Sequence, residues 1–491
     1  MLFFKHLLLE SEEIRTSKKK SYSDQINLNL TSKNNGQITY SSNEGRIYPL
    51  FRIQASSVLE IRDSNISSQN NSPANLGFQD ICFFLEHQSH NQSNRSLEDL
   101  ETQPMVFVQS SFISNFSTVI QNKMLGRIYL EKLYINNTHG HALNISNPYV
   151  LEIKECTIEQ TAKSCINLRF SLELPLTFQR KVLIENCKLN EGKNYGISIF
   201  GEHLSPQACD IHIMENHITA FEKDGICIKN LNISKVRIEK NQITNNRRNG
   251  VSLQNVIDTV SFQQVKMTQN KISQSLYGLM ITDVLFYSEK DEIYENAKAG
   301  ILFSGPMKPL AKDEMAFYRN FPLRSILNQA NIYYNKEAGL TIIGNLKGPV
   351  ILNSCKVHDN TNGVYIKQLS YGFEVCENAT NPRHSLIGSN TLCDPDLSHI
   401  TFDKCVISQN EISGVHIKGI LTKAYFKQTL IYENKNYAIF IQNENEKTHL
   451  EFQDKDQHKV REYISGYVGG SWGALFEQKY NVCKNTTCTI F

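Results

Sequence analysis

The sequence predicts an all-β solenoid of about thirteen stacked, three-sided coils. Two observations predict this class: an apolar phrase recurs every twenty-odd residues, and apolar residues alternate inside each copy as they do in a strand. One copy reads Val236-x-Ile238-x-x-Asn241-x-Ile243. A unit this short cannot bury its own apolar face, so successive copies must stack on one another.

Each copy begins with a strand that ends at a small corner residue. Positions three and five residues before the corner are mostly apolar, which places alternate side chains on one face of a strand. The position two residues after the corner is always apolar, so the alternation shifts by one residue and the chain must bend. The thirteen corner residues are Ser64, Ser111, Leu133, Cys156, Cys187, Asn216, Asn241, Asn270, Asp291, Ala330, Cys355, Cys405 and Thr429.

A second short strand follows the corner and leads through a turn into a third strand. Asparagine recurs in this turn, where its amide is expected to bond backbone groups that the sheets leave unpaired; the copies are Asn246, Asn296, Asn335, Asn360, Asn410 and Asn434. A glycine then precedes the third strand, as the turn glycines Gly196, Gly225, Gly250, Gly363 and Gly414 show. We expect these glycines to adopt a positive backbone φ.

Most corners lie 21 to 31 residues apart, and the longer gaps locate insertions. They fall near residues 86–104, 304–324 and 370–398. The predicted organisation is a polar N-terminal lead or cap over residues 1–54, a β-helix over 55–441, and a segment over 442–491. That last segment is charged and then rich in glycine and aromatic residues, and we expect it to cap the open end of the solenoid or to form a tail.

The chain of 491 residues has 51 basic and 49 acidic residues and a formal net charge of +2. This balance does not indicate nucleic acid or an anionic membrane as the main partner. No segment is apolar for long enough to span a bilayer. The first nine residues, Met1–Leu9, are interrupted by Lys5 and His6 and are followed by acidic residues, so they do not form a convincing signal peptide.

Twelve cysteines are present, and four of them occupy corner positions where other copies carry Asn, Ser or Thr. That placement indicates small buried side chains rather than a disulfide framework. Together with the poor leader, it predicts a cytoplasmic protein, with association to the cytoskeleton as an open alternative. Cys483 and Cys488 form an isolated pair that lacks the two further ligands of a zinc site.

Copies such as Val236–Leu253 resemble the repeats of the right-handed parallel β-helix superfamily, which has the pectin-lyase-like fold, over roughly residues 55–441. Within it the repeats look most like those of the F-box-only proteins and of the Shc-SH2-binding proteins. The resemblance implies a protein-binding scaffold or, for the F-box group, a ubiquitin-ligase substrate adaptor. However, residues 1–50 contain no F-box-like helical segment. The superfamily also includes polysaccharide lyases, glycoside hydrolases and epimerases.

An enzyme of this kind needs carboxylates that converge on one exposed face. The outward column two residues after the turn glycines contains none: Ser198, Cys227, Ser252, Met280, Leu302, Thr341, Tyr365 and His416. The outward column two residues before the corner has acidic residues separated by other types: Lys154, Glu185, Met214, Glu239, Lys266–Met267, Asn353, Asp403 and Lys427. We therefore assign no catalytic, cofactor-binding or metal-binding residue.

The isolated histidines His212, His217 and His358 are expected to be solvated surface residues. Arg247–Arg248, with Lys188, His217 and Lys271, form a mildly basic strip that fits either a solvated turn or a groove for an acidic peptide. Met280, Leu302, Ile343 and Tyr365 form an outward apolar stripe that fits either a partner or an insertion folded over it.

From these observations we expect a non-catalytic interaction or structural scaffold with protein partners and without a cofactor. A secreted carbohydrate-active enzyme is the alternative, and carbohydrate is a partner only under that alternative.

Overall fold

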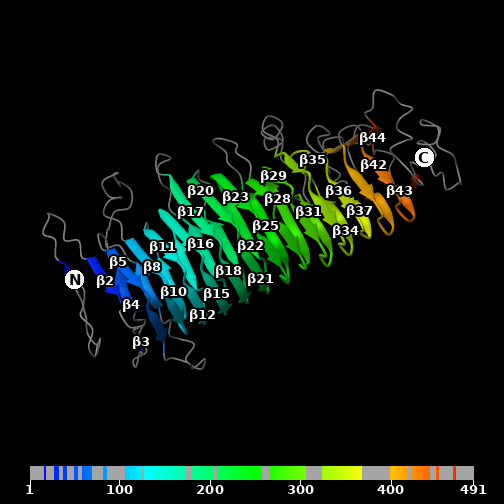
Figure 1. Cartoon of the computed structure of the whole chain (residues 1–491). Helices are drawn as coiled ribbons and strands as arrows, with labels where there is room; N and C mark the ends of the chain where they lie inside the picture. Colours follow the sequence, from blue (N-terminus) through cyan, green and yellow to red (C-terminus); the bar gives the residue numbers. More distant parts are fainter. Residues whose placement is uncertain are drawn as a thin grey trace, which may run out of the picture. The chain divides into compact units, whose positions relative to one another are not determined.

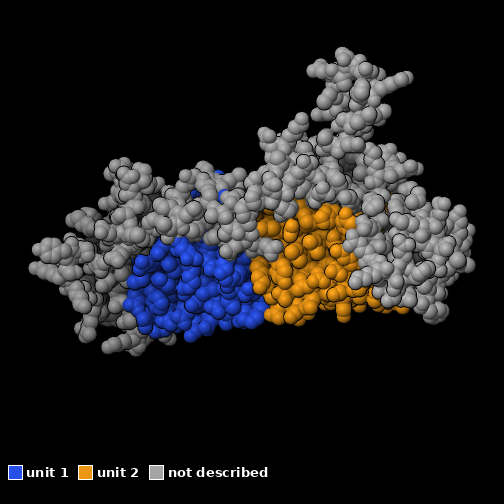
Figure 2. Space-filling view, turned by 90° about the horizontal axis from the view of Figure 1, so that it is seen from above, with its two compact units in different colours: residues 1–247, 258–261 blue, residues 248–257, 262–491 orange. Residues whose placement is uncertain are grey.

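The computed structural model describes residues 16–17, 27–31, 37–40, 49–53, 58–68, 81–85, 105–122, 126–171, 179–202, 207–256, 265–305, 323–344, 346–367, 399–418, 423–442, 449–452 and 468–470. The predicted insertions at 86–104 and 370–398, nearly all of 304–324, and Cys483 and Cys488 lie outside these residues. The chain forms two compact units (Figure 2): unit 1 is residues 1–247 with 258–261, and unit 2 is residues 248–257 with 262–491.

Both units are built from coils that contribute one strand to each of three sheets (Figure 1). We call the strands before the corner sheet 1, those after it sheet 2, and those after the turn sheet 3.

In unit 1, sheet 1 contains β1 (Thr16–Ser17), β2 (Asn27–Thr31), β5 (Val58–Arg62), β8 (Met105–Gln109), β11 (Arg127–Glu131), β14 (Val150–Lys154), β17 (Arg180–Glu185), β20 (Gln207–Met214) and β23 (Ile233–Glu239). Its sheet 2 contains β3 (Gln37–Tyr40), β6 (Asn65–Ser68), β9 (Phe112–Ser114), β12 (Tyr134–Thr138), β15 (Thr157–Thr161), β18 (Lys188–Gly192), β21 (His217–Phe221) and β24 (Gln242–Thr244). Its sheet 3 contains β4 (Pro49–Ile53), β7 (Ile81–Leu85), β10 (Thr118–Asn122), β13 (Leu143–Ser146), β16 (Ile166–Phe170), β19 (Ile197–Gly201) and β22 (Ile226–Leu231).

In unit 2, sheet 1 contains β26 (Val265–Thr268), β29 (Phe286–Glu289), β32 (Ser325–Asn328), β35 (Val350–Asn353), β38 (His399–Asp403), β41 (Lys423–Lys427) and β44 (His449–Phe452). Its sheet 2 contains β27 (Lys271–Ser273), β30 (Glu292–Tyr294), β33 (Asn331–Tyr333), β36 (Lys356–His358), β39 (Val406–Ser408) and β42 (Leu430–Tyr432). Its sheet 3 contains β25 (Asn249–Val256), β28 (Tyr277–Val284), β31 (Ala299–Ser304), β34 (Ala338–Ile343), β37 (Asn362–Lys367), β40 (Ser413–Lys418), β43 (Tyr437–Gln442) and β45 (Val468–Gly470).

Successive strands of each sheet pair in parallel and in register. In unit 1, Leu151 of β14 lies opposite Val182 of β17, and Ile153 opposite Ile184. All four side chains are fully buried, so each coil places its apolar residues on those of its neighbours. The exception to parallel pairing among the described strands is β1, which pairs antiparallel with β2. The predicted all-β, right-handed, three-sided solenoid is confirmed.

The residue before every predicted corner adopts the left-handed conformation, with φ between 47° and 56°. These residues are Asp63, Ser110, Lys132, Glu155, Asn186, Glu215, Lys240, Gln269, Lys290, Gln329, Ser354, Lys404 and Gln428. None is glycine, although this conformation costs about 1 kcal/mol for other residues. Backbone bonds to the next coil offset the strain: the Glu155 N–H donates to the Glu185 carbonyl at 3.0 Å.

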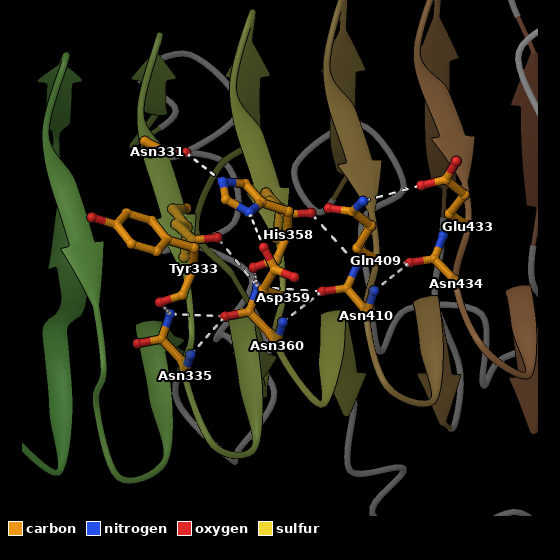
Figure 3. A network of polar contacts seen from close by, with 12 residues as sticks. Asn331, Tyr333, Asn335, His358, Asp359, Asn360, Gln409, Asn410, Glu433 and Asn434 are labelled. Atoms are coloured by element: carbon orange, nitrogen blue, oxygen red, sulfur yellow. Dashed lines mark hydrogen bonds and ion pairs between the residues drawn. The ribbon is translucent and has the colours of Figure 1, made fainter.

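The predicted asparagine row is present in unit 2, in the turns that lead from sheet 2 to sheet 3 in successive coils (Figure 3). The Asn335 side-chain amide donates to the Asn360 Oδ1 at 2.9 Å, and Asn360 in turn donates to Asn410 at 3.3 Å. Asn410 donates to Asn434 at 2.8 Å. The Asn335 backbone N–H also donates to the Asn360 Oδ1, so each side chain satisfies a turn amide that no strand pairs.

The prediction that the turn glycines adopt a positive φ is wrong. Gly344 is the glycine with a positive φ among the described residues, and it is not one of them. A Cβ on Gly363 would instead lie 2.5 Å from the Gly414 carbonyl oxygen, and one on Gly250 would lie 2.3 Å from the Ile272 Cγ2. Glycine is needed at these turns because successive coils approach closely, while the residue before the buried asparagine takes the positive φ.

The strand pairing extends beyond the boundaries expected from the sequence. The strands β2, β3 and β4 fall within residues 1–54 and pair in parallel with β5, β6 and β7. At the other end, β44 and β45 follow residue 441 and pair in parallel with β41 and β43. The coil array therefore occupies more of the chain than the apolar phrase alone indicated.

Candidate functional site

The outward face of sheet 1 in unit 1 carries charged side chains on four neighbouring strands, β14, β17, β20 and β23. Inward and outward side chains alternate along β14, β17, β20 and β23, and the parallel register aligns outward residues of equal distance from the corner. The column four residues before each corner contains, in order, Glu152, Leu183, His212 and Arg237.

Glu152 bridges two lysines on this face. Its carboxylate is 2.7 Å from the Lys181 Nζ on the next strand and 3.0 Å from the Lys154 Nζ on its own strand. Burial alone would raise the pKa of Glu152, but the hydrogen bonds from Lys181 and Lys154 outweigh it and lower that pKa. The carboxylate is therefore held ionised, and the two ammonium groups remain close together on the face.

Next along the sheet, His212 lies against Glu239. The His212 Nε2 is 3.1 Å from the Glu239 Oε2, and the two side chains are 23 % and 25 % exposed. A carboxylate only accepts hydrogen bonds, so Nε2 carries the proton and a neutral His212 presents Nδ1 as an acceptor. Within the described residues Nδ1 has no partner, which leaves it available as a base.

Arg237 lies directly opposite His212 on the neighbouring strand. Asp210 and Lys235 are similarly opposed and form an ion pair at 3.8 Å. Arg237 has no ion pair within the described part of the chain, so its positive charge is available to an anionic group placed beside His212.

A local irregularity lies beside this cluster. The register between β20 and β23 shifts between Gln207 and Asp210, as a β-bulge does. Bulges bend a strand and change the direction of the side chains that follow. Asp210 and His212 are the first outward residues after the shift.

A second cluster lies on sheet 2 of unit 2 and is already saturated (Figure 3). The His358 Nδ1 is 2.6 Å from the Asp359 Oδ2, and its Nε2 is 3.0 Å from the Asn331 Oδ1. The imidazole ring also stacks on Tyr333, with ring centroids 5.3 Å apart and planes 2° apart. Both ring nitrogens and one ring face are occupied, which indicates a structural role and favours the cluster at His212 as the candidate site.

Sequence reasoning missed the His212 cluster because it compared the column two residues before the corner rather than the column four residues before it. The signal was present, since His212 and Arg237 both stand four residues before an asparagine corner. The solvated histidine expected at position 212 is bonded to Glu239 instead. In the basic strip, Lys188 and His217 are register partners as their positions suggested. In the apolar stripe, Leu302 is 7 % exposed and is not open to a partner.

No group of three or more His, Cys, Asp or Glu side chains within the described segments lies in a position to hold a metal ion. Nor do those segments include a helix long and apolar enough to cross a membrane.

Residues 174–320 and 207–382 match the family model described as a right handed beta helix region. This match agrees with the right-handed parallel β-helix fold of the described coils. This β-helix is similar to the periplasmic alginate epimerase AlgG, with 10 % identity over 88 % of this chain and 86 % of that chain and a TM-score of 0.32. It is also similar to two A-modules from Azotobacter vinelandii, those of the mannuronan C-5 epimerases AlgE4 and AlgE6. The AlgE4 A-module is 12 % identical, and the match covers 85 % of this chain and 89 % of that module with a TM-score of 0.30. The AlgE6 A-module is also 12 % identical, and the match covers 81 % of this chain and 89 % of that module with a TM-score of 0.34. No curated protein matches the chain.

These comparisons correct two expectations. The solved structures similar to this β-helix are named as epimerases, which is contrary to the expected non-catalytic scaffold. AlgG is named as a periplasmic protein, which is contrary to the expected cytoplasmic location. The finer resemblance to F-box-only and Shc-SH2-binding proteins finds no support. A likeness at this identity and TM-score concerns the fold, so the chemistry must be argued from the residues of this β-helix.

Proposed function

We propose that this β-helix is a carbohydrate-active enzyme that binds an acidic polysaccharide along sheet 1 of unit 1 and removes a proton next to a sugar carboxylate. The observation that carries the proposal is the His212–Glu239 pair with Arg237 opposite His212. A base, a group that orients it and an unpaired cation are the parts that such a reaction requires.

The carbon-bound hydrogen beside a uronate carboxylate is a weak acid, because its removal adds negative charge to an anion. A cation at the carboxylate stabilises the developing charge. Arg237 is suited to this part, since a guanidinium binds a carboxylate through two parallel hydrogen bonds. The His212 Nδ1 then accepts the proton, and Glu239 stabilises the imidazolium that forms.

The surrounding charges favour an extended substrate. Lys154 and Lys181 lie on the next strands along the same face, and strands repeat at about 4.8 Å. This repeat is similar to the length of one sugar unit, so a polyuronate parallel to the solenoid axis would place one carboxylate near each coil. Return of the proton to the opposite face of the sugar gives epimerisation, and departure of the neighbouring oxygen gives elimination.

The test uses polymannuronate and polygalacturonate as substrates in D2O. Deuterium incorporation beside the carboxylate, followed by NMR, reports proton abstraction, and absorbance of the unsaturated product reports elimination. We expect His212→Gln to lower the rate by about 100-fold or more, the usual loss when a general base is removed. We expect Arg237→Ala to lower the rate and to weaken binding of the polyuronate, with no change toward a neutral glucan.

His217→Gln is the matched control, because His217 lies on sheet 2 of the same unit and should retain full activity. An absence of exchange, elimination and binding with both polyuronates would contradict the proposal. Full activity in His212→Gln would show that another residue is the base.

A further inference from the structure

Two pairs of cysteines occupy the corner position on neighbouring coils. Cys156 and Cys187 are stacked in unit 1, where the Lys188 N–H donates to the Cys156 carbonyl at 2.8 Å. Cys355 and Cys405 are stacked in unit 2, where the Val406 N–H donates to the Cys355 carbonyl at 2.9 Å. The residues on either side are register partners, for example Asn353 with Asp403.

The stacking places each pair of Cα atoms about one strand spacing apart, about 4.8 Å. Disulfides join Cα atoms that are about 4.4 to 6.8 Å apart. The Cys405 Sγ reaches toward the preceding coil, where it lies 3.4 Å from the Leu352 carbonyl, and the neighbouring Cys355 thiol raises the pKa of Cys405. The Cys187 Sγ lies 3.6 Å from the Ile153 carbonyl of the preceding coil, and the neighbouring Cys156 thiol raises the pKa of Cys187.

We propose that Cys156 with Cys187, and Cys355 with Cys405, are oxidation sites at which a disulfide forms between successive coils. None of the eight described cysteines is in a disulfide. Two of the others have different coil neighbours, since Cys209 lies opposite Arg180 and Cys227 opposite Ser198. The proposal is independent of the polysaccharide site.

The reaction balances with hydrogen peroxide as the oxidant. One thiolate attacks a peroxide oxygen, the O–O bond breaks, and the products are a sulfenic acid and a hydroxide that takes up the thiol proton as water. The second thiol then attacks the sulfenic sulfur and releases a second water. Two sulfurs are oxidised, two oxygens are reduced, and a reductant such as dithiothreitol reverses the change.

The environment explains which sulfur reacts first in unit 2 and why the reaction is selective. The neighbouring Cys405 thiol lowers the pKa of the Cys355 thiol, and Cys355 raises that of Cys405, which favours Cys355 as the attacking thiolate. All four corner thiols are at most 1 % exposed, which slows peroxide entry. A stacked partner converts the first sulfenic acid to a disulfide before a second oxidant molecule arrives.

The native protein is treated with hydrogen peroxide and the reaction is quenched. The protein is then unfolded in the presence of an alkylating agent that blocks the remaining free thiols, digested and examined by mass spectrometry. We expect peptides that link Cys156 to Cys187 and Cys355 to Cys405. Cys405→Ser should remove the second link and leave the first, and Cys187→Ser should do the reverse. Serine is suitable because Ser64 and Ser111 occupy the same corner in other coils.

The links close loops of 31 residues (187 − 156) and 50 residues (405 − 355), so the melting temperature of the oxidised wild type should rise by several degrees.

Recovery of all four cysteines in alkylated form from protein whose circular dichroism is native would overturn the proposal. So would links to other cysteines, or sulfinic acid at these positions without a link.

Discussion

Asp291 is the single carboxylate among the thirteen corner residues. Its Oδ1 accepts the Asn270 backbone N–H at 2.7 Å and the Asn270 side-chain amide at 2.9 Å, and its Oδ2 accepts the Ser288 hydroxyl at 2.5 Å. Burial nevertheless raises the pKa of Asp291 from 3.8 to about 6, because these neutral donors only partly replace the lost hydration. Other corners use asparagine, which makes similar bonds without a charge.

We predict that Asp291→Asn raises the free energy of unfolding at neutral pH, and that the increase is smaller at pH 4. The raised folded pKa means that the native state binds the proton more tightly than the unfolded state. The contribution of the neutral Asp291 carboxyl group to the free energy of unfolding is fully present below pH 3.8 and is lost as the pH rises through about 6. That loss corresponds to about 3 kcal/mol in the wild type and is absent in the asparagine variant.

Urea unfolding at pH 4, 5, 6 and 7 measures this difference. The gap between the variant and the wild type should widen across the series and become constant above pH 7. Ser288→Ala is a useful companion, since it removes a donor to the charged form. A gap that does not change with pH would contradict the prediction.

The contacts of single functional side chains were harder to predict from the sequence than the fold was. His212 and Glu239 are 27 residues apart, and their contact depends on the lengths of both intervening loops and on the register shift at β20. A pattern search shows that both residues face outward. It does not show that His212 reaches diagonally to Glu239 on the adjacent strand.

Among the structural elements, the turn before sheet 3 shows how one residue type can serve two physical purposes. Glycine tolerates a positive φ, and it also permits close approach of another backbone. Both requirements give the same letter in the sequence, so the pattern predicted the glycine and misassigned its cause. The corners show the reverse, because eleven of the thirteen residues with a positive φ before a corner are Lys, Glu, Gln or Ser, which carry no such signal.

The close approach leads to a prediction for Gly363→Ala. The added Cβ would lie 2.5 Å from the Gly414 carbonyl oxygen and 2.8 Å from the Asn410 side-chain amide. Relief requires the coils to separate at this turn, which weakens the Asn360–Asn410 bond. We expect a loss of about 1–3 kcal/mol in unfolding free energy, typical of overpacking.

Ala438 provides the matched control, because it occupies the equivalent position in the next coil after Gly414. Ala438→Gly should cost only about 0.5–1 kcal/mol, through backbone entropy. Equal losses in the two variants, measured by chemical denaturation, would rule out a steric origin.

For the whole molecule, contacts of each coil are made mainly with the coils before and after it. Ile158 is fully buried in β15 and lies opposite Ile135 of β12 and Leu189 of β18. The stability of such an array is approximately a sum of coil terms and nearest-neighbour terms. Repeat periodicity carries this information, which is why the solenoid was predictable from the sequence and its outer strands, where the pattern weakens, were not.

We predict that Ile158→Ala acts locally. The cavity should cost about 2–5 kcal/mol, and amide hydrogen exchange should accelerate in β12, β15 and β18. The amides of β21 and β24, farther along the same sheet, should be affected much less. Uniform acceleration throughout unit 1 would indicate instead that the unit unfolds as one cooperative block.

The asparagine row has a direction. From Asn296 to Asn410 each side-chain amide donates to the asparagine of the next coil, and from Asn335 to Asn434 each Oδ1 accepts from the asparagine of the coil before. Any coil spliced into the row with asparagine at this turn would meet a donor on one side and an acceptor on the other. Tandem duplication of a coil-length segment could therefore lengthen the protein without a compensating substitution, and reversal of one coil could not be accommodated.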